Sequence, residues 1–262
     1  MTKTILITGS TDGIGLLTAR KLAASGHTVL LHGRNQAKLD AAAAEIDGNV
    51  DTFSADLSQM TAVKQLAADI RARYDRLDVL INNAGVLKAP CPVLDNGLDI
   101  RFVVNTFAPY LLTELLLPII PKDGRVVNLS SAAQARVDTA AMQGGQVLGD
   151  MDAYAQSKLA ITIWTREWAR SLQDGPVMVA VNPGSLLASK MVKEGFGVAG
   201  HDLSIGADIL IEASLGDRFA DASGAYFDND SGAFANPHAA ALDETHAADV
   251  MNAVQSLVRD HS

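Results

Sequence analysis

The chain has 262 residues, of which 48% are apolar, and 30 acidic against 21 basic side chains give it a formal charge of −9. This composition excludes a disordered or collagen-like chain, and the acidic balance argues against a nucleic-acid partner because nothing would displace counterions from phosphates. The length fits one large α/β domain or two smaller ones, and we expect a single domain over residues 1–262.

Short β-rich runs alternate with longer helical patterns along the chain. The β-rich runs predict strands at Thr4–Thr8, Thr28–His32, Val50–Ala55, Leu77–Asn82, Arg125–Leu129, Pro176–Val181 and Gly224–Phe227. Helical periodicity predicts helices at Ile14–Ser25, Gln36–Ile46, Met60–Arg73, about Gly97–Leu117, Ala153–Leu172 and Thr245–Arg259. The alternation indicates βαβ units, and continuously apolar strands are typical of a sheet covered on both faces. We therefore expect a Rossmann-type, doubly wound α/β fold.

Disulfides, metal sites and membrane segments are not expected. Cys91 is the single cysteine, so we expect a buried small apolar residue, and the six histidines show no spacing typical of a metal site. Met1–Gly9 lacks a signal-peptide pattern. The most apolar stretch, Phe107–Ile120, is interrupted by Glu114 and Pro118 and is shorter than the roughly 20 residues of a membrane span. These patterns predict a cytoplasmic protein without a membrane partner.

Two glycine-containing segments of weak periodicity, residues 137–152 and 185–204, each follow a predicted strand. Because ligands of such folds bind beyond the carboxyl ends of strands, we expect these segments to be substrate loops. Their apolar residues indicate a hydrophobic substrate: Met142, Val147, Leu148, Met151, Leu186, Leu187, Met191 and Phe196. Composition leaves open that these side chains only seal the loops against the sheet.

A glycine-rich turn follows the first predicted strand. It is Gly9-Ser10-Thr11-Asp12-Gly13-Ile14-Gly15, and a helix begins at Ile14. Glycine lets the backbone approach a pyrophosphate, and a helix N-terminus attracts its negative charge. The turn therefore predicts a dinucleotide site, although an ordinary glycine-rich turn has a similar composition.

Further motifs follow at strand ends and in helices: Asn82-Asn83-Ala84-Gly85, Asn105, Ser130-Ser131, Tyr154-Ala155-Gln156-Ser157-Lys158 and Asn182-Pro183-Gly184. Together with the glycine-rich turn, this series resembles the short-chain dehydrogenase/reductase family, whose fingerprint is Thr-Gly-x-x-x-Gly-x-Gly. The resemblance spans Thr8–Gly184 and implies an NAD(P)-dependent oxidoreductase with a Rossmann fold.

Tyr154 and Lys158 are four residues apart on a predicted helix, so their side chains share one face. An ammonium near a phenol favours the phenolate, and a tyrosine that works near neutral pH needs its pKa lowered from about 10. Such a pair also occurs on solvated helix faces. The preceding Ser131 and the dinucleotide motif favour a catalytic pair instead.

The resemblance implies a role for each of four catalytic residues. Tyr154 is the expected general acid/base, and Ser131 the hydrogen-bond donor to the substrate oxygen. Lys158 would hold ribose hydroxyls and lower the pKa of Tyr154, while Asn105 would position a water in a proton relay. Ser131 is preferred because small residues follow it, and Ser130 stays open because a shift of one residue redirects a side chain at a strand end.

Cofactor choice depends on Arg34, at the end of the second predicted strand. An arginine there neutralises a 2′-phosphate, whereas a carboxylate binds a 2′-hydroxyl. We therefore expect NADP(H) rather than NAD(H), with a solvated arginine at a helix start as the alternative. Some NADP-preferring relatives carry a basic residue in the glycine motif, where this chain has Asp12. The resemblance also implies that Asp56 binds the adenine amino group, and a helix N-cap is the alternative.

The complete set of expected cofactor-binding residues is Gly9, Ser10, Thr11, Asp12, Gly13, Ile14, Gly15, Arg34, Asp56, Leu57, Asn83, Ala84, Gly85, Tyr154, Lys158, Pro183 and Gly184. The 23-residue separation of Ser131 and Tyr154, with Gly224–Phe227 and Pro237, resembles the retinol-dehydrogenase-like branch. We expect NADP(H)-dependent interconversion of an alcohol and a carbonyl on a hydrophobic substrate, and the family resemblance implies a homodimer or homotetramer.

A non-catalytic NAD(P)-binding sensor or scaffold is the alternative, since a fold does not fix a function. The complete set of four catalytic residues argues against it, because a binder has no chemical need for all of them. Sugar-nucleotide epimerase or dehydratase chemistry is disfavoured by the glycine spacing and the short C-terminal region.

Overall fold

The computed structural model describes residues 1–172, 174–188, 193, 197 and 199–261. Met191 and Phe196, which the sequence predicted as substrate-loop residues, lie outside the described residues. One sheet has the strand order β3-β2-β1-β4-β5-β6-β7-β8, in which the β7–β8 pair is antiparallel and the other pairs are parallel. The strands are β1 Thr4–Ile7, β2 Thr28–Gly33, β3 Asn49–Ser54, β4 Val79–Asn82, β5 Arg125–Leu129, β6 Val177–Asn182, β7 Tyr226–Asp228 and β8 Ala233–Ala235.

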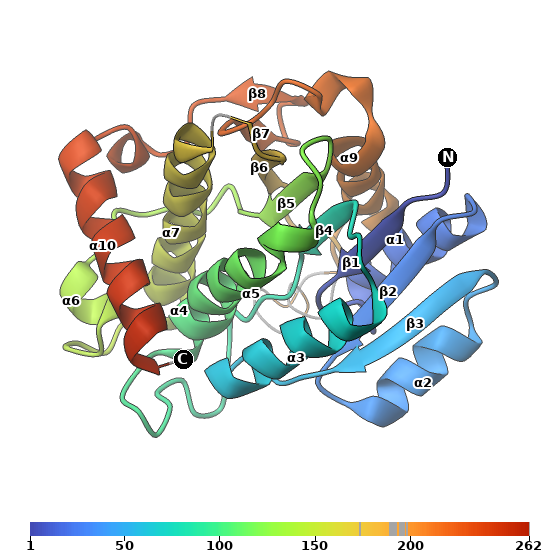
Figure 1. The fold of residues 1–262 in the computed structure, drawn as a ribbon. Coiled ribbons are helices and arrows are strands. Elements are labelled where there is room, and N and C mark those ends of the chain that lie inside the picture. The colour runs from blue at the N-terminus through green and yellow to red at the C-terminus, as the bar shows by residue number, and fades with distance from the viewer. Residues whose placement is uncertain (173, 189–192, 194–196, 198, 262) are drawn as a thin grey trace.

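Helices cover both faces of this sheet (Figure 1). One face packs against α1, α2 and α9, and the other against α3, α5 and α7, with α10 lying against α7. Their bounds are α1 Gly13–Ala24, α2 Gln36–Ala44, α3 Met60–Arg73, α4 Ile100–Phe102, η1 Val103–Phe107, α5 Ala108–Leu116, η2 Leu117–Ile119, α6 Thr139–Met142, α7 Asp150–Ser171, α9 Leu203–Leu215, η3 Asp217–Phe219, η4 Ala239–Ala241 and α10 Glu244–His261.

The central strands are apolar on both faces because each face meets a helical layer. In β1, the side chains of Ile5 and Ile7 belong to the core beneath α1 and α9, while Leu6 belongs to the core beneath α3 and α5. All three are fully buried. The predicted doubly wound α/β fold is confirmed, and its parallel strand ends meet at one edge of the sheet.

Helix α9 was not predicted from the sequence. Its buried face carries Ile209, Leu210 and Ala213, which pack against the sheet and α1. Apolar residues also occupy its outer side, where Ile205 is 48% exposed. This second set of apolar residues hides the helical periodicity that reveals an amphipathic helix.

The segment Ile100–Ile119 differs from the sequence expectation of a run too short for a membrane. It forms a 20-residue helical stretch that is long and apolar enough to cross one. In the structure 72% of its most apolar window is buried inside the protein, with Phe102 and Phe107 in the core between α3 and α7. The apolar surface of this segment is therefore used in packing the described core.

Candidate active site

A cavity of about 1110 Å³ lies where the parallel strands end. The segments that follow β1 to β6 form its walls, as expected for ligand sites of open α/β sheets. Every residue predicted to bind the cofactor lines this cavity except Ser10. Among the predicted catalytic residues, Ser131, Tyr154 and Lys158 line it, and Asn105 does not.

The shape of the glycine-rich turn depends on its glycines, because other residues at these positions would collide with neighbouring atoms or strain the backbone. Gly9 and Gly13 have φ angles of +65° and +56°, which disfavour other residues. A Cβ on Gly15 would lie 2.5 Å from both the Asn83 Nδ2 atom and the Gly9 carbonyl oxygen. Asn83 Nδ2 donates to the carbonyl oxygens of Thr8 at 2.8 Å and Gly9 at 3.0 Å, which joins the turn to the end of β4.

The N-terminus of α1 supplies donors for an anion. Asp12 occupies the N-cap position, but its side chain makes no capping hydrogen bond. The first-turn N–H groups of Gly13, Ile14 and Gly15, which line the cavity, therefore lack an intrahelical or side-chain acceptor within the described chain. Such a helix end fits a pyrophosphate, so the residues present fit a dinucleotide.

Ser10 does not line the cavity and is fully buried. Its Oγ atom accepts a hydrogen bond from His32 N at 2.9 Å and lies 3.4 Å from the His32 carbonyl oxygen. The serine therefore fastens the turn to β2. Its side chain turns toward β2 rather than toward the cavity, and the prediction that Ser10 binds cofactor stays a prediction.

Tyr154 and Lys158 lie on successive turns of α7 and face one cavity. Lys158 Nζ is 5.7 Å from the centre of the Tyr154 ring and donates to the Leu129 carbonyl oxygen at 2.7 Å. The lysine is 4% exposed, and this burial lowers its pKa to about 8. An ammonium has three donors, and among the described residues only Leu129 accepts one. The remaining donors fit the ribose hydroxyls of a nucleotide.

Two effects act on the Tyr154 hydroxyl. Burial raises the pKa of Tyr154, and the nearby Ser131 side chain lowers it by a smaller amount. The pKa of Tyr154 is therefore raised in the protein alone, and the lowering expected from Lys158 is not part of this balance. It stays a proposal for the complex with cofactor.

The structure separates the two candidate serines. Ser130 is 3% exposed, and its Oγ atom is 2.6 Å from Thr162 Oγ1 and 3.3 Å from the Lys158 carbonyl oxygen, both on α7. The Ser131 side chain instead lies beside Tyr154 and lowers the pKa of its hydroxyl. The hydroxyl of Ser130 is thus engaged with the helix, while that of Ser131 is beside the predicted acid/base.

The main chain of Ser131 is fixed from the C-terminal part of the fold. Its carbonyl oxygen accepts hydrogen bonds from Tyr226 OH at 3.1 Å and Gln134 Nε2 at 2.8 Å. Gln134 Oε1 in turn accepts from His238 N at 3.0 Å. Residues beyond β6 therefore support the serine loop, which the motifs upstream did not indicate.

Asn105 lies in η1, a π-helical turn, and is 1% exposed. Its Nδ2 atom donates to the Val86 carbonyl oxygen at 2.9 Å and to Ser157 Oγ at 3.0 Å, while Oδ1 accepts from Val86 N at 2.7 Å. The side chain thus clamps the segment after β4 to α7. Both amide protons are used in this way, so the expected contact with a relay water stays a proposal.

Two cations flank the end of β2 at the cavity. Arg34 and Lys38 are both exposed and both line it. Lys38 was not predicted from the sequence, although a second cation in the first turn after Arg34 could have indicated it. Asp56 also lines the cavity, and its Oδ1 accepts from Ser58 N at 3.0 Å and Ser58 Oγ at 2.8 Å. That carboxylate is thus engaged in the turn before α3.

The apolar wall of the cavity comes mainly from a segment that sequence reasoning missed. Val86–Cys91 lines it together with Ile100, Val104, Leu186 and Leu187. Of these, Leu186 and Leu187 were predicted. The segment after β4 has no periodicity that would reveal it, because it is an irregular loop. Cys91 is exposed in this loop, so the prediction of a buried cysteine was wrong.

The predicted substrate loop 137–152 does not line the cavity. Met142 is fully buried, and Leu148 packs against the same core. Val147 and Met151 are 70% and 43% exposed. The expected substrate contacts of these four side chains are therefore absent from the described cavity wall, and the alternative of packing fits the first two.

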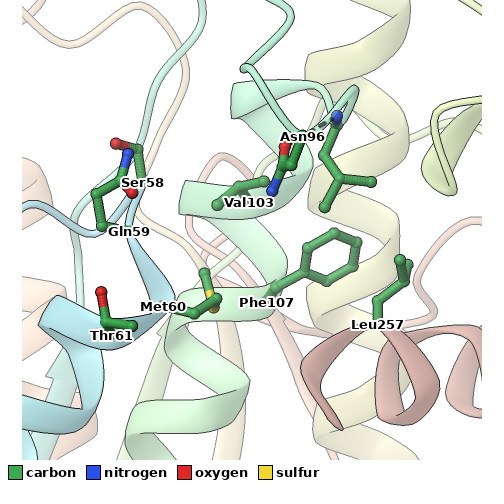
Figure 2. Close-up of a pocket in the computed structure, with 9 residues that line it drawn as sticks. Ser58, Gln59, Met60, Thr61, Asn96, Val103, Phe107 and Leu257 are labelled. Atoms are coloured by element: carbon green, nitrogen blue, oxygen red, sulfur yellow. Dashed lines mark hydrogen bonds between the residues drawn. The ribbon is translucent and has the colours of Figure 1, made fainter. Parts of the chain in front are cut away.

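A second, smaller cavity of about 110 Å³ lies among α3, η1 and α10 (Figure 2). Figure 2 shows Phe107 between Met60 and Leu257 at this cavity. It contains none of the residues that the sequence predicted for catalysis or cofactor binding. The larger cavity is therefore the candidate active site.

The family model of the short chain dehydrogenases matches residues 3–196. The chain belongs to the short-chain dehydrogenase family. Human retinol dehydrogenase 13 is 33% identical over 251 residues, which cover 86% of this chain and 76% of that protein. This similarity confirms the family and supports the branch that the Ser131–Tyr154 spacing indicated.

Two solved structures extend this similarity among short-chain dehydrogenases. An uncharacterized protein from Mycobacterium paratuberculosis has a TM-score of 0.83 at 28% identity, with 98% of this chain and 93% of that chain covered. A Shigella flexneri chain described as a short chain dehydrogenase and solved with NADP has a TM-score of 0.67 at 30% identity, with 87% and 97% covered. Members of this oxidoreductase family bind a nicotinamide cofactor.

Proposed function

We propose that this short-chain dehydrogenase uses NADP(H) to interconvert an alcohol and a carbonyl on a hydrophobic substrate. The observation that carries the proposal is the meeting of Ser131, Tyr154 and Lys158 in the cavity that the glycine-rich turn also lines. A site that only bound a nucleotide would not need a serine and a tyrosine together beside a buried lysine. The sensor or scaffold alternative is therefore less well supported.

The residues of this chain would divide the work as follows. The bound nicotinamide supplies or accepts the hydride. In the reductive direction Tyr154 transfers its hydroxyl proton to the substrate oxygen, and Ser131 donates a hydrogen bond to that oxygen. Lys158 favours the resulting phenolate when its ammonium is charged. Oxidation uses the same groups in reverse.

Preference for the phosphorylated cofactor is supported by charge. Arg34 and Lys38 both stand at the cavity, whereas the acids at its nucleotide end are Asp12 and Asp56. Arginine binds phosphate through paired, charge-assisted hydrogen bonds. The NADP bound in the Shigella flexneri relative is in line with this preference. A cytoplasmic location, and a homodimer or homotetramer, stay predictions from the sequence.

A panel of aldehydes and ketones tests the proposed function directly. We expect apolar carbonyl compounds to cause NADPH oxidation, which is monitored by absorbance. The reason is that Val86–Cys91, Leu186 and Leu187 present an apolar wall. At the same cofactor concentration, turnover with NADH should be at least about tenfold slower. Tight NADPH binding without oxidation of any compound in the panel would favour the sensor instead.

Cys91 gives a test of where the substrate binds. It is the chain's single cysteine and is exposed at the cavity, so uptake of N-ethylmaleimide reports on one position. We expect a saturating active compound from the panel, added with NADP⁺, to slow this labelling about tenfold by covering the apolar wall. Cys91→Ser should take up no label and keep its turnover. An unchanged labelling rate would place the substrate elsewhere.

A further inference from the structure

His32 is a buried titratable side chain in contact with the glycine-rich turn. It lies in β2 and is 2% exposed. Its Nδ1 atom accepts a hydrogen bond from Gly9 N at 3.2 Å, and its Nε2 atom is 3.1 Å from the Ala55 carbonyl oxygen. Because a carbonyl oxygen only accepts, Nε2 must carry the proton, and the lone pair on Nδ1 is then available to Gly9.

The main chain of His32 holds the same turn. Its carbonyl oxygen accepts from Ser10 N at 2.9 Å, and its N–H donates to Ser10 Oγ at 2.9 Å. Strand β2 thus holds Gly9 through the neighbouring Ser10 and through the His32 imidazole. Gly9 also lies close to the segment that follows β4, since an added Cβ would be 2.9 Å from Ala84 Cα. The position of Gly9 therefore determines how the turn meets β4.

We propose that the neutral imidazole of His32 is a positioning residue for the dinucleotide, because it holds the Gly9 N–H and so keeps the glycine-rich turn in its ligand-binding shape. His32 acts through Gly9 rather than by touching the reacting atoms. This inference rests on the proposed cofactor site. Protonation of Nδ1 would set two N–H donors against each other and remove the contact.

The surroundings of His32 keep it neutral. Burial lowers the pKa of His32 to about 4, against smaller raising effects of the Ala55 carbonyl and the Asp56 carboxylate. Around the cavity, the charged side chains on the neighbouring elements are Asp12 before α1, Arg34 after β2, Lys38 on α2 and Asp56 after β3.

This lowered pKa links His32 to stability. Below pH 6.5, the ordinary pKa of histidine, the unfolded chain binds a proton that the folded chain takes up only near pH 4. The free energy of unfolding therefore falls as the pH drops from 6.5 to about 4. Any replacement of His32 by a residue that does not titrate removes this contribution.

Two replacements separate the acceptor from the rest of the side chain. In His32→Asn, Oδ1 can take the place of Nδ1 as acceptor for Gly9. In His32→Gln, the amide can reach the place of Nε2 and donate to Ala55, but no acceptor remains near Gly9. We expect His32→Asn to bind NADP⁺ within about threefold of the original protein, and His32→Gln to bind about tenfold more weakly, by titration calorimetry at neutral pH.

A control comes from His27, at the other end of β2. Its Nδ1 also accepts a backbone hydrogen bond, from Lys3 N at 3.2 Å, but it does not line the cavity. His27→Gln should leave NADP⁺ affinity unchanged. Neither His32 variant has a titrating group at this position, so both should lose the fall in stability toward pH 4. If His32 acted only on stability, the two variants would lose NADP⁺ affinity equally. Equal affinity of the two His32 variants would overturn the proposal.

A measurement on the unaltered protein needs no variant to fold. Nitrogen NMR of ¹⁵N-histidine-labelled protein should show His32 protonated at Nε2 and unprotonated at Nδ1, with and without NADP⁺. A proton on Nδ1 at neutral pH would overturn the inference, because Gly9 would then have no acceptor. Failure of the unaltered protein to bind either NADP⁺ or NAD⁺ is a distinct result, which overturns the proposed cofactor site itself.

Discussion

Replacement of Tyr154 by phenylalanine should lower kcat about 1000-fold while the dissociation constant for NADPH changes less than about threefold. A positioned general acid or base contributes roughly 100- to 10,000-fold to a rate, and the phenylalanine ring preserves the packing while removing the hydroxyl. Steady-state turnover with a compound identified in the carbonyl panel, together with a fluorescence titration of NADPH, measures the two quantities.

Tyr74→Phe is the matched control for this change. Tyr74 OH hydrogen-bonds the Asp51 carboxylate, away from the cavity, so this variant loses a hydroxyl without touching the predicted site. We expect unchanged kcat and a loss of stability of about 1 kcal/mol. Near-normal kcat in Tyr154→Phe would discard the mechanism, because a group other than Tyr154 would then have to donate the proton.

Replacement of Arg34 by aspartate should weaken NADPH binding about 100-fold and NADH binding only a few-fold. The change removes charge-assisted hydrogen bonds to the 2′-phosphate and adds a like charge beside it. NADH has a hydroxyl at that position, which the new carboxylate can accept from. Titration of both cofactors against the variant measures the difference.

Arg71→Asp alters the net charge by the same amount from an exposed position on α3 that does not line the cavity. It should leave both affinities nearly unchanged, which separates the local contact from the overall field. Equal weakening of NADPH and NADH in Arg34→Asp would show that this arginine does not bind the phosphate. Lys38, the second cation at the same place, would then be the next candidate.

Local spacing was a good guide to elements whose geometry repeats along the chain. Tyr154 and Lys158 share a helix face because a turn takes nearly four residues, and both line the cavity. The continuous apolar runs predicted the parallel strands, and the glycine-rich turn directly after the first of them was therefore predicted at the correct edge of the sheet. Helix α9 was missed because apolar residues occur on both of its sides, and periodicity then carries no signal.

The direction of side chains at strand ends was beyond sequence reasoning. Ser10 turns toward β2 and Ser130 toward α7, because a strand alternates sides and its last residue leaves that alternation. The irregular segment Val86–Cys91 is similarly placed by contacts distant in sequence, since Asn105 holds Val86. Contacts of this kind depend on how separate elements pack.

The sequence by itself determined the family, the fold class and the position of Tyr154, Lys158 and the glycine-rich turn at one edge of a parallel sheet, because periodicity and motif order are local properties. Tertiary structure alone decided that Ser131 rather than Ser130 meets Tyr154, that Lys38 joins Arg34, and that His32 holds Gly9. Those pairings join strands and helices far apart in the chain, and only the packing of the sheet against its two helical layers brings them within hydrogen-bond distance.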